Sequence, residues 1–468
     1  MPFWLNIFFV ILLVSIILME IAENGHPIRT LAWILVLTFL PVIGLVLYFF
    51  FGRDRKNRRM VSAEDLEHLQ ENSAQACRGQ IREDIPAPLR NLVTLLYSAG
   101  HALPVDGNDV QVYTDFPSMY DDLLADLESA QHHIHFQFFK FEDDELGRKA
   151  EEILSRKARE GVEVRLQIDD LANIWRRRFY HRMEKNGVQV KPFLRVHLLM
   201  LNSDTNYRNH RKNVVIDGRV GYTGGMNIAK RYAVGIRAGI WRDTHIRVTG
   251  PAVSELQSAF LVDWKFSTKQ LLDAPEYYPP VPPAGNLLMQ IATSGPMGEF
   301  RVIMQGMLRI LAESQRYVYI QTPYFIPTEA VVLAMRNAAL SGVDVRLMIP
   351  YRGDGNFLVT LASRSYVKDM LAAGVKVFFY EKGFLHAKTI VADDAVVSIG
   401  STNMDIRSFE QDFEINAFIY DHDMGVRMRE IFEEDARSCS IVSEAAWAER
   451  PAFVRFEESF ARLFSPLL

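Results

Sequence analysis

The chain contains His210-Arg-Lys212-Asn-Val-Val-Ile-Asp217 and, 176 residues later, His386-Ala-Lys388-Thr-Ile-Val-Ala-Asp393. Side chains two residues apart on a strand share a face, so the histidine and lysine of each copy should project together. The apolar run continues the strand, and the aspartate starts a turn before a second apolar run. Each copy therefore predicts a β-hairpin, and the shared spacing indicates a duplication.

Small residues and an asparagine end each return strand, namely Gly224, Gly225 and Asn227 in the first copy, and Gly400, Ser401 and Asn403 in the second. Such residues free backbone N–H groups, which is typical of a phosphate cradle. Paired imidazoles, ammonium groups and carboxamides suit a phosphodiester. One histidine would attack phosphorus while the other protonates the leaving alkoxide, without a metal ion.

A single copy would have a simpler explanation, because a lone His-x-Lys is usually a solvated strand edge and Gly-Gly is usually a bend. The paired copies favour the chemical interpretation. Asp217 and Asp393 belong to the motif and count among the catalytic candidates. They fall at the turn and on the opposite parity from the lysines, so we expect them mainly to fix the hairpins.

The duplication extends beyond the motifs. Residues 161–168 (GVEVRLQI) are repeated as 342–349 (GVDVRLMI), and each repeat follows a helix-like stretch. Strands and helices alternate before each hairpin, which predicts an α/β half with a mostly parallel sheet, built twice around a pseudo-twofold axis. The proline-rich stretch 273–285 is the predicted linker between the halves.

Composition divides the rest of the chain. The predicted units are an amino-terminal membrane hairpin with a basic flank at 1–59, a helical connector at 60–110, the first half at 111–272, the linker at 273–285, and the second half with a helical tail at 286–468. The tail carries Phe456, Phe460, Leu463 and Phe464 at helical spacing. We expect this stripe to dock on the core rather than on a membrane.

Residues 3–19 and 31–51 are apolar runs, and the second is long enough to span a bilayer. They predict a transmembrane hairpin. A cleaved signal peptide is disfavoured because the first run lacks a basic leader and a small-x-small cleavage site. The segment Arg53-Asp-Arg-Lys-Asn-Arg-Arg59 would stay in the cytoplasm, since basic flanks face that side. This segment also suits anionic lipid head groups.

A formal net charge of -5 argues against a nucleic-acid binder with a dominant basic surface. The cysteines, Cys77 and Cys439, are far apart and match no metal-binding spacing, so free thiols in a reducing compartment are expected. The histidines also lack a recognisable ligand pattern. We therefore expect no cofactor and no metal.

The duplicated HxKxxxxD pattern followed by GG or GS-x-N resembles the phospholipase D superfamily. That resemblance implies a phosphohistidine intermediate and a downstream acidic residue that orients an imidazole. Glu414 matches the acidic position after the second copy, and Asp243 is the nearest match after the first, at a different offset. The phrases at 207–212 (YRNHRK), 241–245 (WRDTH) and 321–327 (QTPYFIP) are similar to bacterial cardiolipin synthases.

This resemblance implies a transfer between two phosphatidylglycerol molecules that gives cardiolipin and glycerol, at the cytoplasmic face of the bacterial inner membrane. We expect His210 to attack and His386 to act as acid and then base, with Glu414 serving His386. The partners would be membrane phospholipids and no nucleic acid. The motifs specify the phosphodiester and not the acceptor. A phospholipase D-type hydrolase and a phosphatidylserine synthase-like transferase therefore stay open, whereas the intact motifs disfavour a lipid-binding scaffold and the apolar hairpin a nuclease.

Overall fold

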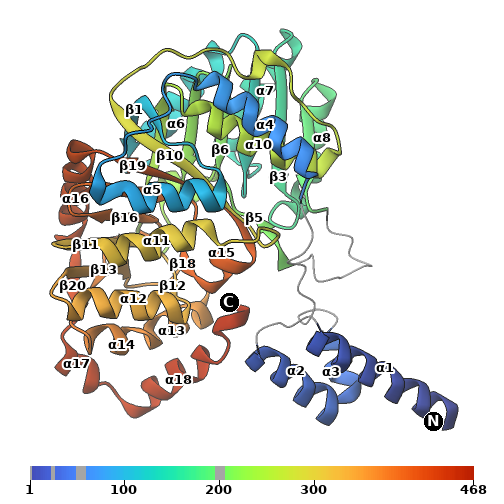
Figure 1. The fold of residues 1–468 in the computed structure, drawn as a ribbon, viewed down its shortest axis with the longest axis vertical. Coiled ribbons are helices and arrows are strands. Elements are labelled where there is room, and N and C mark those ends of the chain that lie inside the picture. Colours follow the sequence, from blue (N-terminus) through green and yellow to red (C-terminus); the bar gives the residue numbers. More distant parts are fainter. Residues whose placement is uncertain (1–2, 23–26, 49–59, 196–205) are drawn as a thin grey trace.

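The structure is a computed structural model that describes residues 3–22, 27–48, 60–195 and 206–468. Two α/β halves lie side by side, with the amino-terminal helices beside them (Figure 1). Two helices, α4 (Ala63–Ala76) and α5 (Ala87–Gly100), precede the first half. The two-half α/β architecture expected from the duplication is present.

The first half is formed by strands and helices that alternate up to the motif hairpin. Its strands are β1 (Val105–Tyr113), β2 (His133–Phe138), β3 (Glu163–Asp169), β4 (Gln189–Phe193), β5 (Arg208–Asn209), β6 (Asn213–Ile216), β7 (Val220–Gly224), β8 (Ile240–Arg242) and β9 (His245–Thr249). Its helices are α6 (Phe116–Ser129), α7 (Glu145–Arg159), η2 (Ile174–Arg176), α8 (Arg177–Lys185), α9 (Lys230–Val234) and α10 (Val253–Thr268).

The second half repeats this plan after η4 (Pro275–Tyr277), a short 3-10 helix in the proline-rich stretch. Its strands are β10 (Leu287–Ser294), β11 (Tyr317–Gln321), β12 (Phe325–Ile326), β13 (Asp344–Pro350), β14 (Lys376–Tyr380), β15 (Gly383–Leu385), β16 (Thr389–Ala392), β17 (Val396–Gly400), β18 (Met404–Asp405), β19 (Asp412–Tyr420) and β20 (Cys439–Ile441). Its helices are α11 (Val302–Glu313), α12 (Glu329–Leu340), α13 (Phe357–Ser365), α14 (Val367–Leu371), α15 (Ile406–Glu410), α16 (His422–Ala436), α17 (Glu444–Ala448), α18 (Ala452–Arg462) and η5 (Ser465–Leu467).

Over the described residues, one 16-stranded sheet runs through both halves, which join where β1 pairs with β10. The prediction of a mostly parallel sheet is wrong. Only β2-β3-β4 and β11-β13-β14 are parallel blocks in this sheet's main path, and the other neighbours there are antiparallel. The motif hairpins cause this, because strands joined by a tight turn must pair antiparallel.

Apolar side chains cover both faces of the sheet. In the first half, helices α6, α7 and α8 pack on β2 and β3. On the opposite face, Leu256 of α10 and Phe432 of α16 share one core with strands of both halves. Fully burying such a side chain contributes about 1.5 to 3 kcal/mol. This shared core fixes the halves against each other and so fixes the motif strands that approach their boundary.

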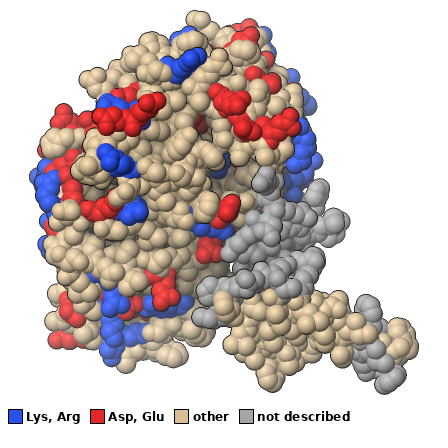
Figure 2. All heavy atoms as spheres, in the orientation of Figure 1, with Lys and Arg blue, Asp and Glu red and all other residues tan. Residues whose placement is uncertain are grey.

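The amino-terminal helices α1 (Phe3–Ala22), α2 (Pro27–Phe39) and α3 (Pro41–Leu47) expose large apolar side chains, among them Ile11, Phe39 and Val42. In Figure 2 this part of the surface is almost entirely tan, in contrast with the charged halves. Among the described residues, no helix combines the length and hydropathy needed to cross a bilayer. The predicted transmembrane hairpin is therefore not supported, and its basic flank lies outside the described residues.

The carboxy-terminal helix α18 corrects another prediction. Phe456, Phe460 and Leu463, which we expected to dock on the core, are 66%, 53% and 74% exposed. The opposite side of the helix packs against the protein. There Glu458 is buried and accepts two hydrogen bonds from Arg450 at 2.6 and 2.9 Å. Helical periodicity identified an apolar face correctly, but it could not tell which side of the helix meets the protein.

Candidate active site

The segment before the first motif pairs with the second half of the chain. Strand β5 runs parallel to the start of β19, and the His210 backbone N–H donates to the Phe413 carbonyl over 2.9 Å. This register brings the next residue of β19, Glu414, to the imidazole. His210 Nδ1 lies 2.9 Å from Glu414 Oε1, and both side chains are buried.

The second motif mirrors this arrangement. Strand β15 pairs in parallel with β8, and the His386 backbone N–H donates to the Arg242 carbonyl over 2.6 Å. His386 Nδ1 therefore lies 2.5 Å from Asp243 Oδ2. The expected pairing of Glu414 with His386 is wrong. Each histidine takes its carboxylate from the other half, because the strand before each motif is paired across the boundary.

Both motif lysines are buried beside the histidines. Burial lowers the pKa of Lys212 to about 7 and that of Lys388 to about 8, with nearby carboxylates opposing the shift. Lys212 Nζ donates to the His210 carbonyl over 2.6 Å, whereas Lys388 Nζ lies 2.9 Å from His386 Nδ1. The site thus holds two poorly solvated ammonium groups, and an anion between them would be strongly attracted.

The histidines favour their neutral forms in this pocket. Burial, followed by Lys212 among the nearby cations, lowers the pKa of His210 to about 4, although Glu414 opposes this. Burial and the two lysines also lower the pKa of His386. Burial raises the pKa of Glu414, but His210 and Lys212 outweigh it and keep the net pKa below its usual range. His210 can therefore donate Nδ1–H to a carboxylate and keep its Nε2 lone pair free.

The small residues Gly225 and Ser401, which were predicted to form a phosphate cradle, have another role in the structure. The backbone N–H groups of Gly225 and Ser401 already donate to the carbonyls of Thr244 and Ile415, at 2.8 and 2.9 Å. A Cβ on Gly225 would lie 2.0 Å from Asp243 Oδ1, so only glycine leaves room for that carboxylate. The Ser401 hydroxyl donates to Glu414 Oε2. These residues accommodate the carboxylates instead of presenting free N–H groups.

Gly224 and Gly400 are also constrained by close packing. Gly224 has a φ of 148° and lies against the His245 backbone. A Cβ on Gly224 would lie 2.6 Å from the His245 Cα. A Cβ on Gly400 would lie 2.2 Å from Asn416 Oδ1. Both positions therefore require glycine for packing at the ends of the return strands, rather than for contact with a phosphate.

The two motif asparagines differ. Asn227 Oδ1 accepts the Lys140 backbone N–H over 3.0 Å, and its Nδ2 donates to the Tyr232 hydroxyl over 2.6 Å. Asn403 is buried, yet its Oδ1 has no hydrogen-bond partner among the described residues. An amide oxygen accepts hydrogen bonds, so this one could bond a ligand hydroxyl but not a phosphate oxygen. A nonbridging phosphate oxygen needs the Nδ2 donor, which in Asn227 already donates to Tyr232. Asn403 is thus the more suitable of the two for holding a phosphodiester.

Asp217 and Asp393 lie in the hairpin turns, at the far ends of the motif strands from the histidines. Both have positive φ, at 52° and 54°. The Asp217 carboxylate accepts three backbone N–H groups, from Gln131, His132 and His133, at 2.7 to 2.8 Å. Asp393 makes the equivalent bonds to residues 315–317. The aspartates therefore tie each turn to the neighbouring strand, and the structure does not bring them to the imidazoles.

Replacing Asp217 by asparagine is expected to reduce stability and not turnover. Asparagine tolerates the left-handed backbone, but its amide cannot accept all three N–H groups as well as a carboxylate does. The loss should be about 1 to 3 kcal/mol, as for hydrogen bonds to a charged group. Denaturant unfolding measures it. A fall in kcat of a hundredfold or more, with normal stability, would contradict this assignment.

Arg211, between His210 and Lys212, was not singled out by the motif analysis. Its side chain projects to the opposite side from theirs, where Nη1 donates to Asp263 Oδ1 over 2.6 Å and Nε to the Glu414 carbonyl over 3.1 Å. The aspartate lies near the end of α10. This buried ion pair therefore holds the backbone of the residue whose carboxylate meets His210.

A matching pair supports the second carboxylate. Arg242 donates from Nε to Asp435 Oδ1 over 3.0 Å and from Nη1 to the Asp243 carbonyl over 2.5 Å. Asp435 lies near the end of α16, the counterpart of α10 in the second half. The recurrence of Phe-x-x-Asp, at Phe260 to Asp263 and Phe432 to Asp435, is the sequence signal that could have identified both aspartates.

The pKa values of the buried lysines predict that activity falls at alkaline pH. In the free enzyme, kcat/KM should rise as pH increases through about 4, where His210 loses its proton. It should fall as pH rises through about 7 to 8, where Lys212 and Lys388 lose their charge. A pH profile of kcat/KM tests this. In Lys212→Arg the alkaline limb should move to higher pH, because a guanidinium stays charged and only Lys388 would then lose its charge in this range. An unmoved limb would exclude Lys212 as its source.

Comparison with known proteins identifies the family. A family model described as the PLD-like domain of cardiolipin synthase matches residues 123–264 and 307–436. A second, described as a phospholipase D-nuclease amino-terminal segment, matches residues 7–53. The chain is 38% identical over 477 residues to the major cardiolipin synthase ClsA of Bacillus subtilis, covering 99% of this chain and 98% of the relative. It is 37% identical to a cardiolipin synthase of Listeria welshimeri, covering 99% and 97%.

Among solved structures, the phosphatidylserine synthase of Haemophilus influenzae superposes with a TM-score of 0.62 at 13% identity. The match covers 82% of this chain and all of that one, so it shows the shared two-half fold. The family itself rests on the sequence matches, which extend over both halves and the amino-terminal segment. This chain belongs to the cardiolipin synthase family of the phospholipase D superfamily.

Proposed function

We propose that this enzyme transfers a phosphatidyl group from one phosphatidylglycerol to the terminal hydroxyl of another, giving cardiolipin and glycerol. The observation that carries the proposal is the buried pair of histidines, each with a carboxylate from the opposite half and a lysine from its own motif. Two imidazoles with separate carboxylates suit a two-step transfer, in which one forms the covalent bond and the other moves the proton.

In the first step His210 Nε2 attacks phosphorus, the bond from phosphorus to the glycerol oxygen breaks, and His386 supplies the proton to the departing glycerol. Binding of the phosphodiester anion raises the His386 pKa and so favours its protonated form. In the second step neutral His386 takes the proton of the incoming hydroxyl, whose oxygen attacks phosphorus as the bond to His210 breaks. Lys212, Lys388 and Asn403 neutralise and hold the nonbridging oxygens.

An asymmetry between the histidines supports this assignment of roles. His210 Nδ1 contacts Glu414, a carboxylate that stabilises the positive charge forming on the ring during attack. His386 Nδ1 lies close to both Asp243 and the Lys388 ammonium. A neighbouring cation disfavours the charged, covalently modified imidazole and suits a residue that gives up its proton.

The test is the product mixture of the purified full-length protein with phosphatidylglycerol vesicles. Cardiolipin and glycerol should form in equal amounts without added nucleotide, and activity should survive a chelator. Phosphatidate as the dominant product would indicate a hydrolase. An absolute requirement for CDP-diacylglycerol would indicate a phosphatidylserine synthase-like transferase instead. Mass spectrometry of the lipid products distinguishes these outcomes.

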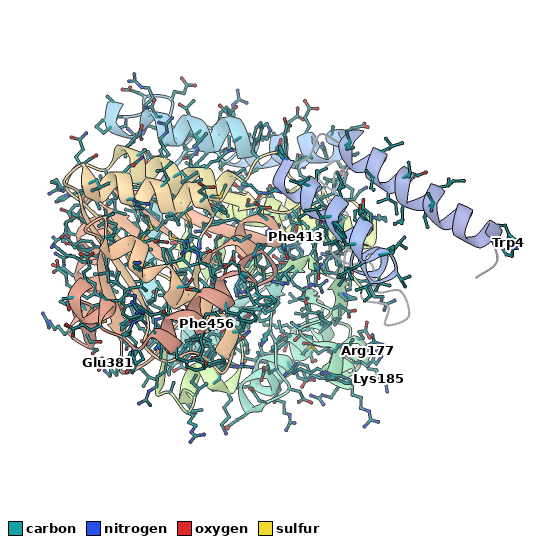
Figure 3. The ribbon with its side chains drawn as sticks, turned by 90° about the horizontal axis from the view of Figure 1, so that it is seen from below. Trp4, Arg177, Lys185, Glu381, Phe413 and Phe456 are labelled. Carbon is teal, nitrogen blue, oxygen red and sulfur yellow. The ribbon has the colours of Figure 1, made fainter. Side chains whose placement is uncertain are left out.

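We further propose that the protein binds the bacterial inner membrane through α1 to α3 and α18, with both halves on the cytoplasmic side. The substrate cannot leave the bilayer cheaply, so the pocket must be held at its surface. Trp4 marks the outer end of the amino-terminal helices, and Phe456 lies on the side of the molecule seen from below (Figure 3). Exposed apolar side chains on both segments would be buried by contact with lipid.

Vesicle binding by α18 can be measured directly. Replacing Phe456 and Phe460 together with serine should weaken binding to phosphatidylglycerol vesicles about tenfold or more, because each buried aromatic ring contributes about 1.5 to 3 kcal/mol. Replacing Leu333 and Leu340 together with serine serves as a control, since these side chains are 56% and 68% exposed but lie on α12. Cosedimentation gives the affinity. Equal vesicle affinity of the double variant and the wild type would show that α18 does not contribute to membrane binding.

A further inference from the structure

A third lysine lies beside the catalytic pocket without an acidic partner. Lys140 follows β2 and is half-buried, and burial together with Arg231 lowers its pKa. Among the described residues, no carboxylate approaches its ammonium group within ion-pairing distance. An ammonium group that is partly removed from water without a counterion is unfavourable, which makes it suited to an anionic ligand.

One aromatic ring connects this lysine to the reaction centre. The Phe139 ring centroid lies 5.9 Å from Lys140 Nζ, 5.6 Å from Lys212 Nζ and 5.0 Å from the His210 ring centroid. Lys140 also contributes to the lowered pKa of His386, after burial, Lys388, Lys212 and His210. The ammonium group therefore lies one aromatic ring away from the histidine and lysine of the first motif.

The neighbouring arginines are only partly neutralised. Glu142 Oε1 pairs with Arg176 over 3.2 Å and also with Arg231. These two arginines share one carboxylate, so the cluster keeps a positive excess to which Lys140 adds an unpaired charge. The arrangement attracts an anion toward Lys140 rather than toward the arginines, whose donors are partly used.

In the second half, whose residues 286–468 are all described, the equivalent position holds no cation. The bridge between Phe141 and Ile228 matches the pairing of Phe325 with Met404, which places Tyr324 opposite Lys140 under the pseudo-twofold relation. The Tyr324 hydroxyl donates to Asp354 over 2.8 Å. The first half thus presents the Lys140 ammonium group at this position, whereas the second half presents the neutral Tyr324 phenol hydrogen-bonded to Asp354. Two lipids bound on these sides would meet different surroundings.

The position of Lys140 is fixed by the first motif. Its backbone N–H donates to Asn227 Oδ1 over 3.0 Å, and its carbonyl accepts the Ile228 N–H over 3.2 Å. The residue is thus held by the loop that follows the return strand of the first hairpin. This explains why the Asn227 amide is engaged while that of Asn403 is open: the first asparagine positions a cation.

We propose that Lys140 binds the phosphodiester of the acceptor lipid and so selects a phospholipid, rather than water or a small alcohol, as the acceptor. This inference rests on the proposed function. The two phosphorus atoms of the product, joined through glycerol, lie roughly 6 to 8 Å apart at ordinary bond lengths. With one phosphate between the histidines, the second falls at the edge of the pocket, where Lys140 lies.

The phosphohistidine intermediate is where this selection acts. Water and the acceptor hydroxyl compete for the same phosphorus, and His386 serves both as base. An acceptor whose own phosphate is held by Lys140 has its terminal hydroxyl kept near the reaction centre, which raises its effective concentration. Water gains nothing from that contact. Removing the cation should therefore change the ratio of products more than the rate at which the donor is consumed.

The test compares Lys140→Met with the wild-type enzyme in phosphatidylglycerol vesicles, with cardiolipin and phosphatidate quantified by mass spectrometry. Loss of a charge-assisted contact should lower the ratio of cardiolipin to phosphatidate about tenfold to a hundredfold. Lys140→Arg keeps the charge and should restore most of the ratio. Lys149→Met, at an exposed position on α7, is the matched control and should behave like the wild type.

A second measurement separates acceptor binding from a general defect. With isotopically labelled glycerol added as a soluble acceptor that has no phosphate, transfer gives labelled phosphatidylglycerol. Lys140→Met and the wild type should partition alike between this product and phosphatidate. A parallel fall in all products, or an unchanged ratio of cardiolipin to phosphatidate, would overturn the inference. If the wild-type enzyme itself makes no cardiolipin from phosphatidylglycerol, the proposed function fails, and this result is separate from either outcome for Lys140.

Discussion

Replacing His210 by alanine is expected to reduce cardiolipin formation by at least a thousandfold, because the covalent route is lost and the catalytic groups act as a unit. Brief reaction of the wild type with phosphatidylglycerol labelled in its phosphate, followed by an alkaline quench, should leave acid-labile label on the peptide containing His210. A phosphorus–nitrogen bond survives base and breaks in acid. Peptide mapping after protease digestion locates the label.

Glu414→Gln is the matched variant for this experiment. It keeps the size of the side chain that meets His210 Nδ1 and the backbone contact to Arg211, but it removes the negative charge. Labelling of His210 should slow by about a hundredfold, and label should still appear at the same residue. Label found only at His386 would reverse the two roles. The absence of label under every trapping condition would favour direct displacement.

The chemistry of the site could be predicted from the sequence more fully than its geometry. Duplicated histidines and lysines identify a phosphodiester site because residue type and spacing are local properties. The pairing of Glu414 with His210 is not local: it depends on β5 joining β19 across the boundary between the halves. Strand pairing over such a separation leaves no trace in the spacing of the motif, so the sequence suggested the nearer histidine.

The buried arginines show a second limit of the same kind. Arg211 and Arg242 occupy positions in which periodicity predicts only a side chain on the opposite face from the motif residues. Their function is visible only in the structure, where Arg211 pairs with Asp263 of α10 and Arg242 pairs with Asp435 of α16. The small residues after each hairpin were misjudged for a related reason, because a glycine that admits a carboxylate and one that admits a phosphate look alike in sequence.

Replacing His386 by alanine should also abolish turnover with phosphatidylglycerol, by a hundredfold to ten-thousandfold, the range for loss of a general acid and base. Its signature should differ from that of His210→Ala. With a phosphatidyl ester of nitrophenol, whose leaving group needs no proton, His386→Ala should still form the covalent adduct on His210. The adduct should accumulate, because no base remains to activate the incoming hydroxyl. Rapid quench with labelled phosphate measures both its formation and its decay.

Asp243→Asn is the companion change, since it removes the charge that lies 2.5 Å from His386 Nδ1 and leaves the imidazole present. It should slow decay of the adduct less than His386→Ala does. The rate of adduct formation from the nitrophenyl ester should stay close to that of the wild type. Equal rates of decay in the wild type and His386→Ala would rule out His386 as the base of the second step. Proton removal from the acceptor would then have to fall to another group in the pocket, and Lys388, with its pKa lowered to about 8, is the nearest candidate.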